Sequence, residues 1–233
     1  MTGDAARQHP LHEFHLALAG RPWVVLHAGM ILTHADEQRY LRDTPRRAPY
    51  GIALWPAAIA LAHDMAARGP DAFAGKRVLE LGAGTGLPGL VAAALGASRV
   101  VQTDRDAPAL ALCERNARGN NIGAERIEHR LADWADWRDG ARYDWIIGSD
   151  ILYGDATHSL LRHIFAANLA PDGGRLLLSD PFRGASLRLL ESPQEEGWSV
   201  SVTRWNLGDG EHNRGTGDDS RAVGVFELSA EPG

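Results

Sequence analysis

The segment Val78–Gly89, which reads V-L-E-L-G-A-G-T-G-L-P-G, constrains the fold of this chain more than any other segment. It begins as a short apolar strand, breaks at a run of glycines and continues into the apolar segment Leu90–Leu95. Glycine has no Cβ and adopts left-handed backbone conformations freely, so such a turn can bring backbone N–H groups and a helix N-terminus close to a ligand. We therefore predict a nucleotide-binding turn between a strand and a helix.

Strand-like and helix-like segments alternate after this turn, which predicts a parallel sheet covered by helices. The expected parallel strands are Arg77–Leu81, Arg99–Thr103, Ile127–Arg130, Trp145–Ser149 and Arg175–Ser179. The expected helices are Pro88–Leu95, Ala107–Asn116, Thr157–Leu169 and a segment near Ala185–Leu190.

The C-terminal part departs from this alternation. Trp198–Leu207 and Ala222–Leu228 are both β-like, and the polar segment Gly208–Arg221 joins them without a helix. Two strands connected in this way are expected to pair antiparallel. The predicted fold is therefore α/β: a Rossmann-like seven-stranded sheet with helices on both faces and the last strand antiparallel.

The N-terminal part predicts a small extension of this fold. Phe14–Leu18 and Trp23–His27 are β-prone and flank the turn Ala19–Pro22, which indicates a β-hairpin. Pro56 can serve as the first residue of a helix over Ala57–Arg68. We expect a tail and hairpin over residues 1–48 and the main domain over residues 49–233.

Size and charge restrict the class of protein. A length of 233 residues favours one domain with small additions. A net charge of −6 disfavours a general nucleic-acid binder, and the single cysteine, Cys113, excludes an intrachain disulfide. The sequence shows neither a signal-peptide core nor an apolar run of membrane-spanning length. We expect a cytoplasmic protein with no membrane partner, no nucleic-acid partner and no metal site.

The glycines alone leave the nucleotide open. Gly84–Gly89 matches the G-x-G-x-x-G pattern of dinucleotide-binding turns. Asp104 ends the next strand, where an acidic side chain hydrogen-bonds the ribose of a nicotinamide dinucleotide or of S-adenosyl-L-methionine (SAM). The alternative for Asp104 is a cap on the helix that begins near Ala107.

Three features favour SAM. Glu80 lies two residues before the first glycine, and an acid there can favour the ammonium and sulfonium charges of SAM. A closing antiparallel pair of strands is typical of methyltransferases. Asp133 and Trp134 follow the third strand, where a carboxylate can accept from an adenine amino group and an indole can cover the ring. The alternative for Trp134 is packing in the core.

Several motifs together resemble a known family. E-L-G-A-G-T-G over Glu80–Gly86, followed by Asp104, resembles motif I and the ribose acid of class I, seven-strand SAM-dependent methyltransferases. Asp150–Tyr153 has the D-x-x-Y pattern, and Gly51–Ala58 resembles the tryptophan-containing segment before motif I. The chain is thereby similar to the D-x-x-Y protein lysine methyltransferases, methyltransferase family 16. Asp180–Arg183 resembles the D-P-G-R segment of electron-transfer-flavoprotein lysine methyltransferases, with Phe182 in place of glycine.

The resemblance implies a set of site residues. Those implied or expected to bind the cofactor are Trp55, Glu80, Gly82, Ala83, Gly84, Gly86, Asp104, Asp133, Trp134 and Ser149. Asp150 and Tyr153 would line the acceptor site as catalytic residues. The alternatives are that Asp150 is a helix N-terminal acid favoured by the helix dipole and that Tyr153 packs in the core.

The expected function is transfer of a methyl group from SAM to a protein side chain, most readily a lysine. A small-molecule amine or other small acceptor is the first alternative. A dinucleotide-binding oxidoreductase and a non-catalytic binding module are the others, and Glu80 with the closing hairpin argues against an oxidoreductase. Ile151 and Leu152 stand where the methyltransferases of adenine and glutamine carry two prolines, which disfavours those acceptors.

Overall fold

A mixed sheet organises the computed structural model, which describes residues 10–30, 50–152, 154–183, 198–207, 212–214 and 222–230. The strand order is β11-β10-β12-β9-β8-β5-β6-β7. The five parallel strands are β5 (Arg77–Leu81), β6 (Arg99–Asp104), β7 (Ile127–Leu131), β8 (Trp145–Ser149) and β9 (Arg175–Asp180). This confirms the predicted parallel part of the sheet.

The last strand of the chain enters the sheet between two others. β12 (Ala222–Ala230) pairs antiparallel with β9 on one side and with β10 (Trp198–Leu207) on the other. This confirms the predicted seven strands with the last one antiparallel. The structure adds an eighth, β11 (His212–Arg214), inside the segment expected to be a polar loop. An edge strand needs backbone partners but no apolar face, so alternation of side chains does not reveal it.

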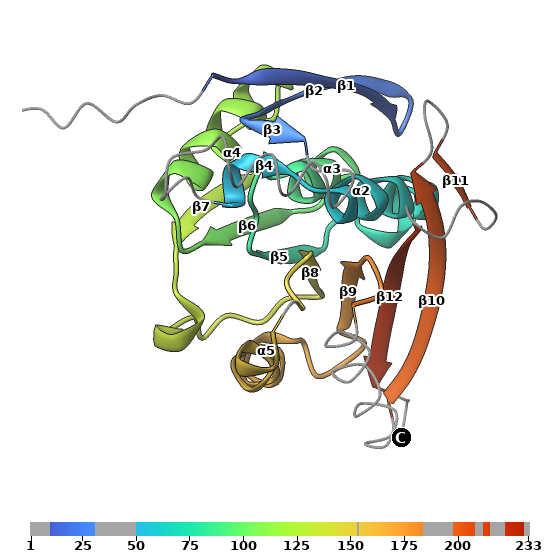
Figure 1. The fold of residues 1–233 in the computed structure, drawn as a ribbon. Coiled ribbons are helices and arrows are strands. Elements are labelled where there is room, and N and C mark those ends of the chain that lie inside the picture. Colours follow the sequence, from blue (N-terminus) through green and yellow to red (C-terminus); the bar gives the residue numbers. More distant parts are fainter. Residues whose placement is uncertain are drawn as a thin grey trace, which may run out of the picture.

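Helices cover both faces of the sheet, as predicted (Figure 1). α2 (Pro56–Arg68), α3 (Leu87–Ala94) and α4 (Ala107–Gly119) lie on one face, and α5 (Asp155–Asn168) lies on the other. Short 3-10 turns are η1 (Tyr50–Ile52), η2 (Pro70–Ala72) and η3 (Trp134–Asp136). The helix expected near Ala185–Leu190 lies outside the described residues. Among those that are described, no helix is long and apolar enough to span a membrane.

Two apolar cores hold these layers together. One lies between the sheet and α2 and α3, and the other lies between the sheet and α5. The central strands β5 and β8 are buried on both faces because helices cover both sides of the sheet, as the burial of every residue in Val78–Leu81 illustrates.

The predicted N-terminal hairpin is present and belongs to the same core. β1 (His12–Leu18) pairs antiparallel with β2 (Arg21–His27), and Trp23 and Val25 are buried in the apolar core that also contains residues of α2 and α3. The chain then forms β3 (Gly29–Met30), which pairs in parallel with β4 (Ala53–Leu54). The hairpin therefore lies across the helical layer (Figure 1).

The strand order also determines where a ligand can bind. β5 is flanked by β6 on one side and β8 on the other, so the chain builds the sheet outward in two directions from β5. In open parallel sheets, the loops at such a switch point diverge and leave a crevice outside the carboxyl ends of the strands.

Candidate functional site

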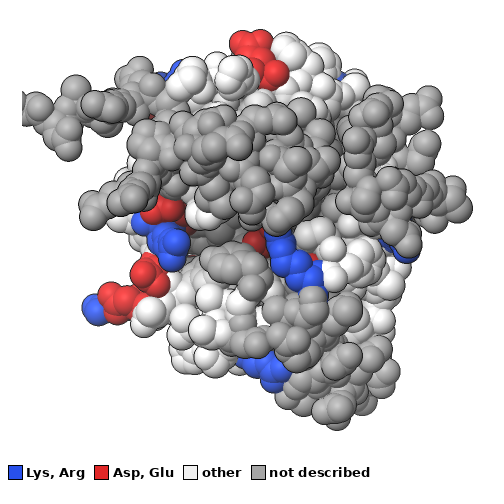
Figure 2. Space-filling view, viewed as in Figure 1, with Lys and Arg blue, Asp and Glu red and all other residues white. Residues whose placement is uncertain are grey.

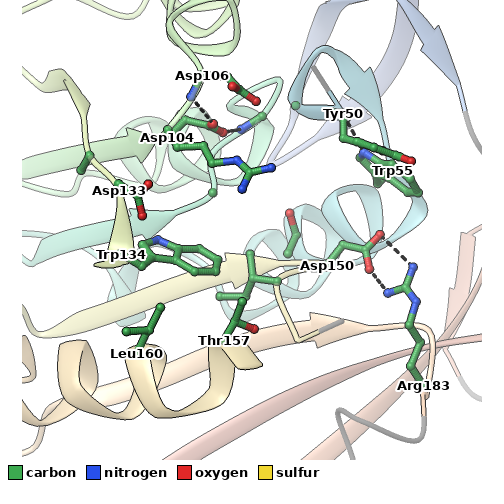
Figure 3. Close-up of a pocket in the computed structure, with 17 residues that line it drawn as sticks. Tyr50, Trp55, Asp104, Asp106, Asp133, Trp134, Asp150, Thr157, Leu160 and Arg183 are labelled. Carbon is green, nitrogen blue, oxygen red and sulfur yellow. Dashed lines mark hydrogen bonds and ion pairs between the residues drawn. The ribbon is translucent and has the colours of Figure 1, made fainter. Parts of the chain in front are cut away.

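A cavity of about 580 Å³ opens at this switch point. Gly82 after β5, Asp104 at the end of β6 and Ser149 at the end of β8 all line it. Its volume falls in the roughly 300–1,000 Å³ range of small-molecule sites. Basic and acidic side chains lie together around the hollow on this face (Figure 2), and Figure 3 shows the residues that line it.

The glycine-rich turn forms one wall of the cavity, and at Gly82 and Gly84 this wall consists of backbone without side chains. Gly82, Gly84 and Gly86 have φ values of 62°, 58° and 80°, which L-residues with a Cβ rarely adopt. A Cβ at Gly82 would lie 3.0 Å from Ile151 Cγ2, and one at Gly84 would lie 3.1 Å from the Gly51 carbonyl oxygen. Glycine is therefore required at both places for conformation and for space.

Asp104 is bonded on both of its carboxylate oxygens. Oδ2 accepts from the Gly84 N–H at 3.0 Å, and Oδ1 accepts from the Asp106 N–H at 3.0 Å. Burial raises the pKa of the Asp104 carboxyl, against the opposing effect of these two donors. Asp106, not Asp104, is the N-cap residue of α4, so the alternative of a simple helix cap does not describe Asp104. It braces the turn and lines the cavity at once.

Glu80 lies beneath the turn and not in the cavity. Its side chain is buried, and Oε2 accepts from Gln102 Nε2 at 2.6 Å and from the Gly89 N–H at 3.1 Å. Burial, the largest influence, raises the pKa of Glu80 to about 8, so the group is largely uncharged at neutral pH. In place of the direct contact with cofactor charges expected from the sequence, Glu80 supports the turn from below.

Two other residues of the expected cofactor set also lie outside the cavity lining. The Ala83 N–H donates to the Thr103 carbonyl at 2.9 Å, which ties the turn to β6. Gly86 faces α4, where a Cβ would lie 2.8 Å from Gln102 Nε2 and 3.0 Å from Cys113 Sγ. Both residues shape the turn.

Aromatic side chains line two sides of the cavity. Trp55 Nε1 donates to the Tyr50 carbonyl at 3.1 Å, and the two rings stack with centroids 6.0 Å apart. Trp134, in η3, extends into the cavity in Figure 3. Asp133 caps η3 by accepting from the Ala135 N–H at 2.9 Å and also lines the cavity.

The end of the cavity near β8 and β9 holds an ion-pair cluster. Arg183 Nη1 donates to Asp150 Oδ1 and, at 3.2 Å, to Asp180 Oδ2. The Asp180 carboxylate is fully buried and also accepts from the Arg183 N–H at 2.7 Å. Burial by itself lowers the pKa of Arg183, but the hydrogen bonds and charges of Asp150 and Asp180 together raise it. Figure 3 shows this contact at the edge of the cavity.

Backbone strain accompanies this cluster. Asp150 and Phe182 have φ values of 58° and 60°, in the left-handed region that costs L-residues energy. Phe182 stands where the resembling D-P-G-R segment has glycine, the residue best suited to that conformation. Its ring packs edge-on against Phe226 with centroids 5.8 Å apart, and the Arg204 guanidinium lies 5.8 Å from its centroid. Phe182 therefore adopts the left-handed conformation with its ring packed, and the next residue, Arg183, pairs with Asp150.

The structure thus brings together most of the predicted site. Trp55, Gly82, Gly84, Asp104, Asp133, Trp134, Ser149 and Asp150 line one cavity, and Tyr153 lies outside the described residues. The cavity is also lined by residues outside the predicted site set, namely Tyr50, Gly51, Arg105, Asp106, Ala132, Ile151, Thr157, Leu160 and Arg183. Arg105, Ala132 and Ile151 directly adjoin a predicted site residue in the sequence. Thr157 and Leu160 come from α5 and carry no motif. No group of three or more metal-ligating side chains occurs in the parts of the chain that the structure describes.

The family pattern of lysine methyltransferases matches residues 40–180, more than half of the chain. The chain belongs to the lysine methyltransferase family. This confirms the resemblance seen in the motifs. Membership of this family implies that SAM is the cofactor. The exposed backbone of Gly82 and Gly84 beside the Asp104 carboxyl fits a nucleoside-containing cofactor such as SAM.

Individual lysine methyltransferases resemble the chain over part of their length. Protein N-terminal and lysine N-methyltransferase efm7 of Schizosaccharomyces pombe is 33% identical over 151 residues, which cover 60% of this chain and 59% of the relative. Protein N-lysine methyltransferase METTL21A of Xenopus tropicalis is 36% identical over 138 residues, which cover 57% of this chain and 62% of the relative. The match therefore spans less than two thirds of these relatives.

Solved structures confirm the fold. The ribosomal protein L11 methylase of Lactobacillus delbrueckii subsp. bulgaricus has a TM-score of 0.51 and 18% identity. The likeness covers 76% of this chain and 78% of that one. At this identity, the comparison supports the methyltransferase fold alone.

Proposed function

We propose that this protein transfers the methyl group of SAM to the side-chain nitrogen of a lysine in a protein, and that it does so in the cytoplasm. The observation that carries this proposal is that, in a member of the lysine methyltransferase family, one cavity gathers Asp104, Trp134 and Asp150 at the carboxyl ends of β6, β7 and β8. The carboxyl ends of β6 and β7 would hold the nucleoside, and the end of β8 would hold the acceptor.

The cofactor side of the cavity is built for an adenosine group. The Asp104 carboxylate has about four lone-pair positions, and two backbone N–H groups use two of them. The others remain for ribose hydroxyls. The Trp134 indole offers a flat apolar surface, and Trp55 and Ser149 also line the cavity. The bound cofactor supplies an electrophilic methyl group on a sulfonium.

The acceptor side has to deal with a protonated amine. With a free pKa near 10.4, about one lysine in 2,500 is neutral at pH 7, a handicap of roughly 4–5 kcal/mol. A bare carboxylate would stabilise the ammonium form and so increase this handicap. Asp150 is not bare, because Arg183 pairs with it. Because Arg183 offsets its negative charge, Asp150 can orient an N–H of the acceptor amine while stabilising the ammonium form of the lysine less than a bare carboxylate would.

Alignment is the main contribution expected of the protein. Methyl transfer is an in-line displacement, and holding donor and acceptor in line can supply about 7–11 kcal/mol. The rigid turn, the clamped Asp150 and the stacked Tyr50–Trp55 pair all limit motion at the cavity. Tyr153 remains a predicted member of the acceptor wall.

The test separates cofactor binding from transfer. Calorimetry with S-adenosyl-L-homocysteine (SAH) should show binding by the unaltered chain and a loss of roughly ten- to hundred-fold in Asp104→Ala, since charged hydrogen bonds contribute about 1.5–3 kcal/mol each. Asp150→Ala should retain SAH binding and lose transfer. Equal loss of SAH binding in both variants would contradict these roles.

Tritiated SAM identifies the acceptor. A lysate of the source organism lacking this protein should show a labelled protein band when the purified chain and labelled SAM are added, and acid hydrolysis should release labelled methyl-lysine. Label in small molecules alone would replace the protein acceptor with a small amine. Absence of SAH binding together with binding of a nicotinamide cofactor would reject the methyltransferase proposal.

A further inference from the structure

Two asparagines of α4 join the N-terminal hairpin to the rest of the fold. Asn116 Oδ1 accepts from the Leu26 N–H at 2.8 Å, and its Nδ2 donates to the Leu26 carbonyl at 3.1 Å. Asn120 does the same to Val24, with distances of 3.0 Å and 2.7 Å. Each side-chain amide thus pairs with the edge of β2 as a neighbouring strand would.

The spacing of the two asparagines suits this pairing. Four residues of α-helix advance about 6 Å, and two residues of β-strand advance about 6.7 Å. Asn116 and Asn120 therefore meet Leu26 and Val24, whose N–H and C=O groups point away from β1. Both asparagines are buried, with exposed fractions of 1% and 4%. Among the described strands only β1 pairs with β2, and these two side-chain amides close the other edge of β2.

Only one of the two asparagines also reaches the glycine-rich turn. The second Nδ2 hydrogen of Asn116 donates to the Thr85 carbonyl at 2.9 Å, in the turn that lines the cavity. Cys113, one helical turn earlier on the same face of α4, donates to the Gly84 carbonyl at 3.2 Å. The corresponding second bond of Asn120 goes to the carbonyl of Asn116 in its own helix, at 2.8 Å.

We propose that Asn116 is a positioning residue for SAM, through which docking of the hairpin β1–β2 orders the glycine-rich turn; this inference rests on the proposed function, since SAM is its ligand. One buried amide holds Leu26 of the hairpin and Thr85 of the turn. When the hairpin is docked, the amide is held by two bonds on one side and presents its remaining N–H to the turn. The hairpin is in this way part of the cofactor site without lining it.

The coupling is reciprocal, as any linkage between two binding equilibria must be. If a docked hairpin favours cofactor binding, bound cofactor must favour the docked hairpin. Both directions can be measured with SAH alone, so the test requires no methyl acceptor.

The experiment compares Asn116→Ala with Asn120→Ala. Each variant removes a pair of bonds to β2, but only Asn116→Ala removes the bond to Thr85. We expect comparable losses in Tm, a Kd for SAH raised roughly ten-fold in Asn116→Ala and a Kd changed less than about two-fold in Asn120→Ala. Equal Kd values in the two variants would overturn the inference.

Hydrogen exchange of the unaltered chain decides the matter if Asn116→Ala does not fold. SAH should slow amide exchange in residues 21–27 of β2 as well as in residues 82–87 of the turn. Slowing confined to the turn would overturn the inference while leaving the proposed function in place. Failure of the unaltered chain to bind SAH would overturn the proposed function, and the inference with it.

Discussion

Replacing Glu80 by glutamine should make the protein more stable at alkaline pH. A glutamine keeps an oxygen where Oε2 accepts from Gln102 and Gly89, so both hydrogen bonds persist. Its amide group lies where Oε1 has no hydrogen-bond partner among the described residues. The substitution therefore removes an ionisable proton and changes little else at the site.

The magnitude follows from the raised pKa of Glu80. The folded protein binds this proton with a pKa of about 8, against an ordinary value of 4.5. Between these values the unfolded chain has lost the proton and the folded protein has kept it, so the free energy of unfolding falls as the pH rises. At 1.36 kcal/mol for each pH unit, the full window amounts to about 4–5 kcal/mol as an upper bound.

Urea unfolding followed by tryptophan fluorescence at several pH values from 5 to 9 measures this effect. The difference between Glu80→Gln and the unaltered chain should be small near pH 5, grow toward pH 8 and then level off. Glu114→Gln, at a side chain that is 58% exposed on α4, is the matched control and should follow the unaltered chain. Parallel pH profiles for Glu80→Gln and the unaltered chain would refute a protonated, buried Glu80.

Three further predictions concern the turn, the acceptor wall and the cysteine. Gly89→Ala should lower the free energy of unfolding by about 1–3 kcal/mol in thermal unfolding, because the added Cβ would lie 2.3 Å from Glu80 Oε2. Gly119→Ala is the control, since nothing lies within 4 Å of the added Cβ. This control should be neutral or stabilising. Arg183→Gln should move the rising limb of the single-turnover pH profile up by roughly one pH unit and Arg183→Lys should restore it; an unchanged profile would contradict the charge argument. Burial raises the pKa of the Cys113 thiol well above its ordinary value, so Ellman's reagent should modify it only after unfolding, and rapid reaction in the native protein would contradict its burial.

Most of the predicted site residues lie together because they come directly after parallel strands, whose carboxyl ends meet at one edge of the sheet. Gly82, Asp104 and Asp150 each follow a predicted strand, and parallel strands bring their carboxyl ends to one edge of the sheet. The order of the strands was not needed to place them at that edge. The motif could not predict that Glu80 and Gly86 lie outside the cavity lining. A motif does not distinguish a residue that touches a ligand from one that supports the turn.

The amino-acid sequence by itself determined the alternation of strands and helices, the glycine turn, the antiparallel end of the sheet and the family. These features depend on side-chain periodicity and on short motifs, and both can be recognised without knowing how distant segments pack. Only the tertiary structure decided that Glu80 is buried and largely neutral, that Arg183 clamps Asp150 from 33 positions away and that Asn116 links the hairpin to the turn. Burial and long-range hydrogen bonds depend on which segments meet in space, and that is settled by the packing of the whole chain.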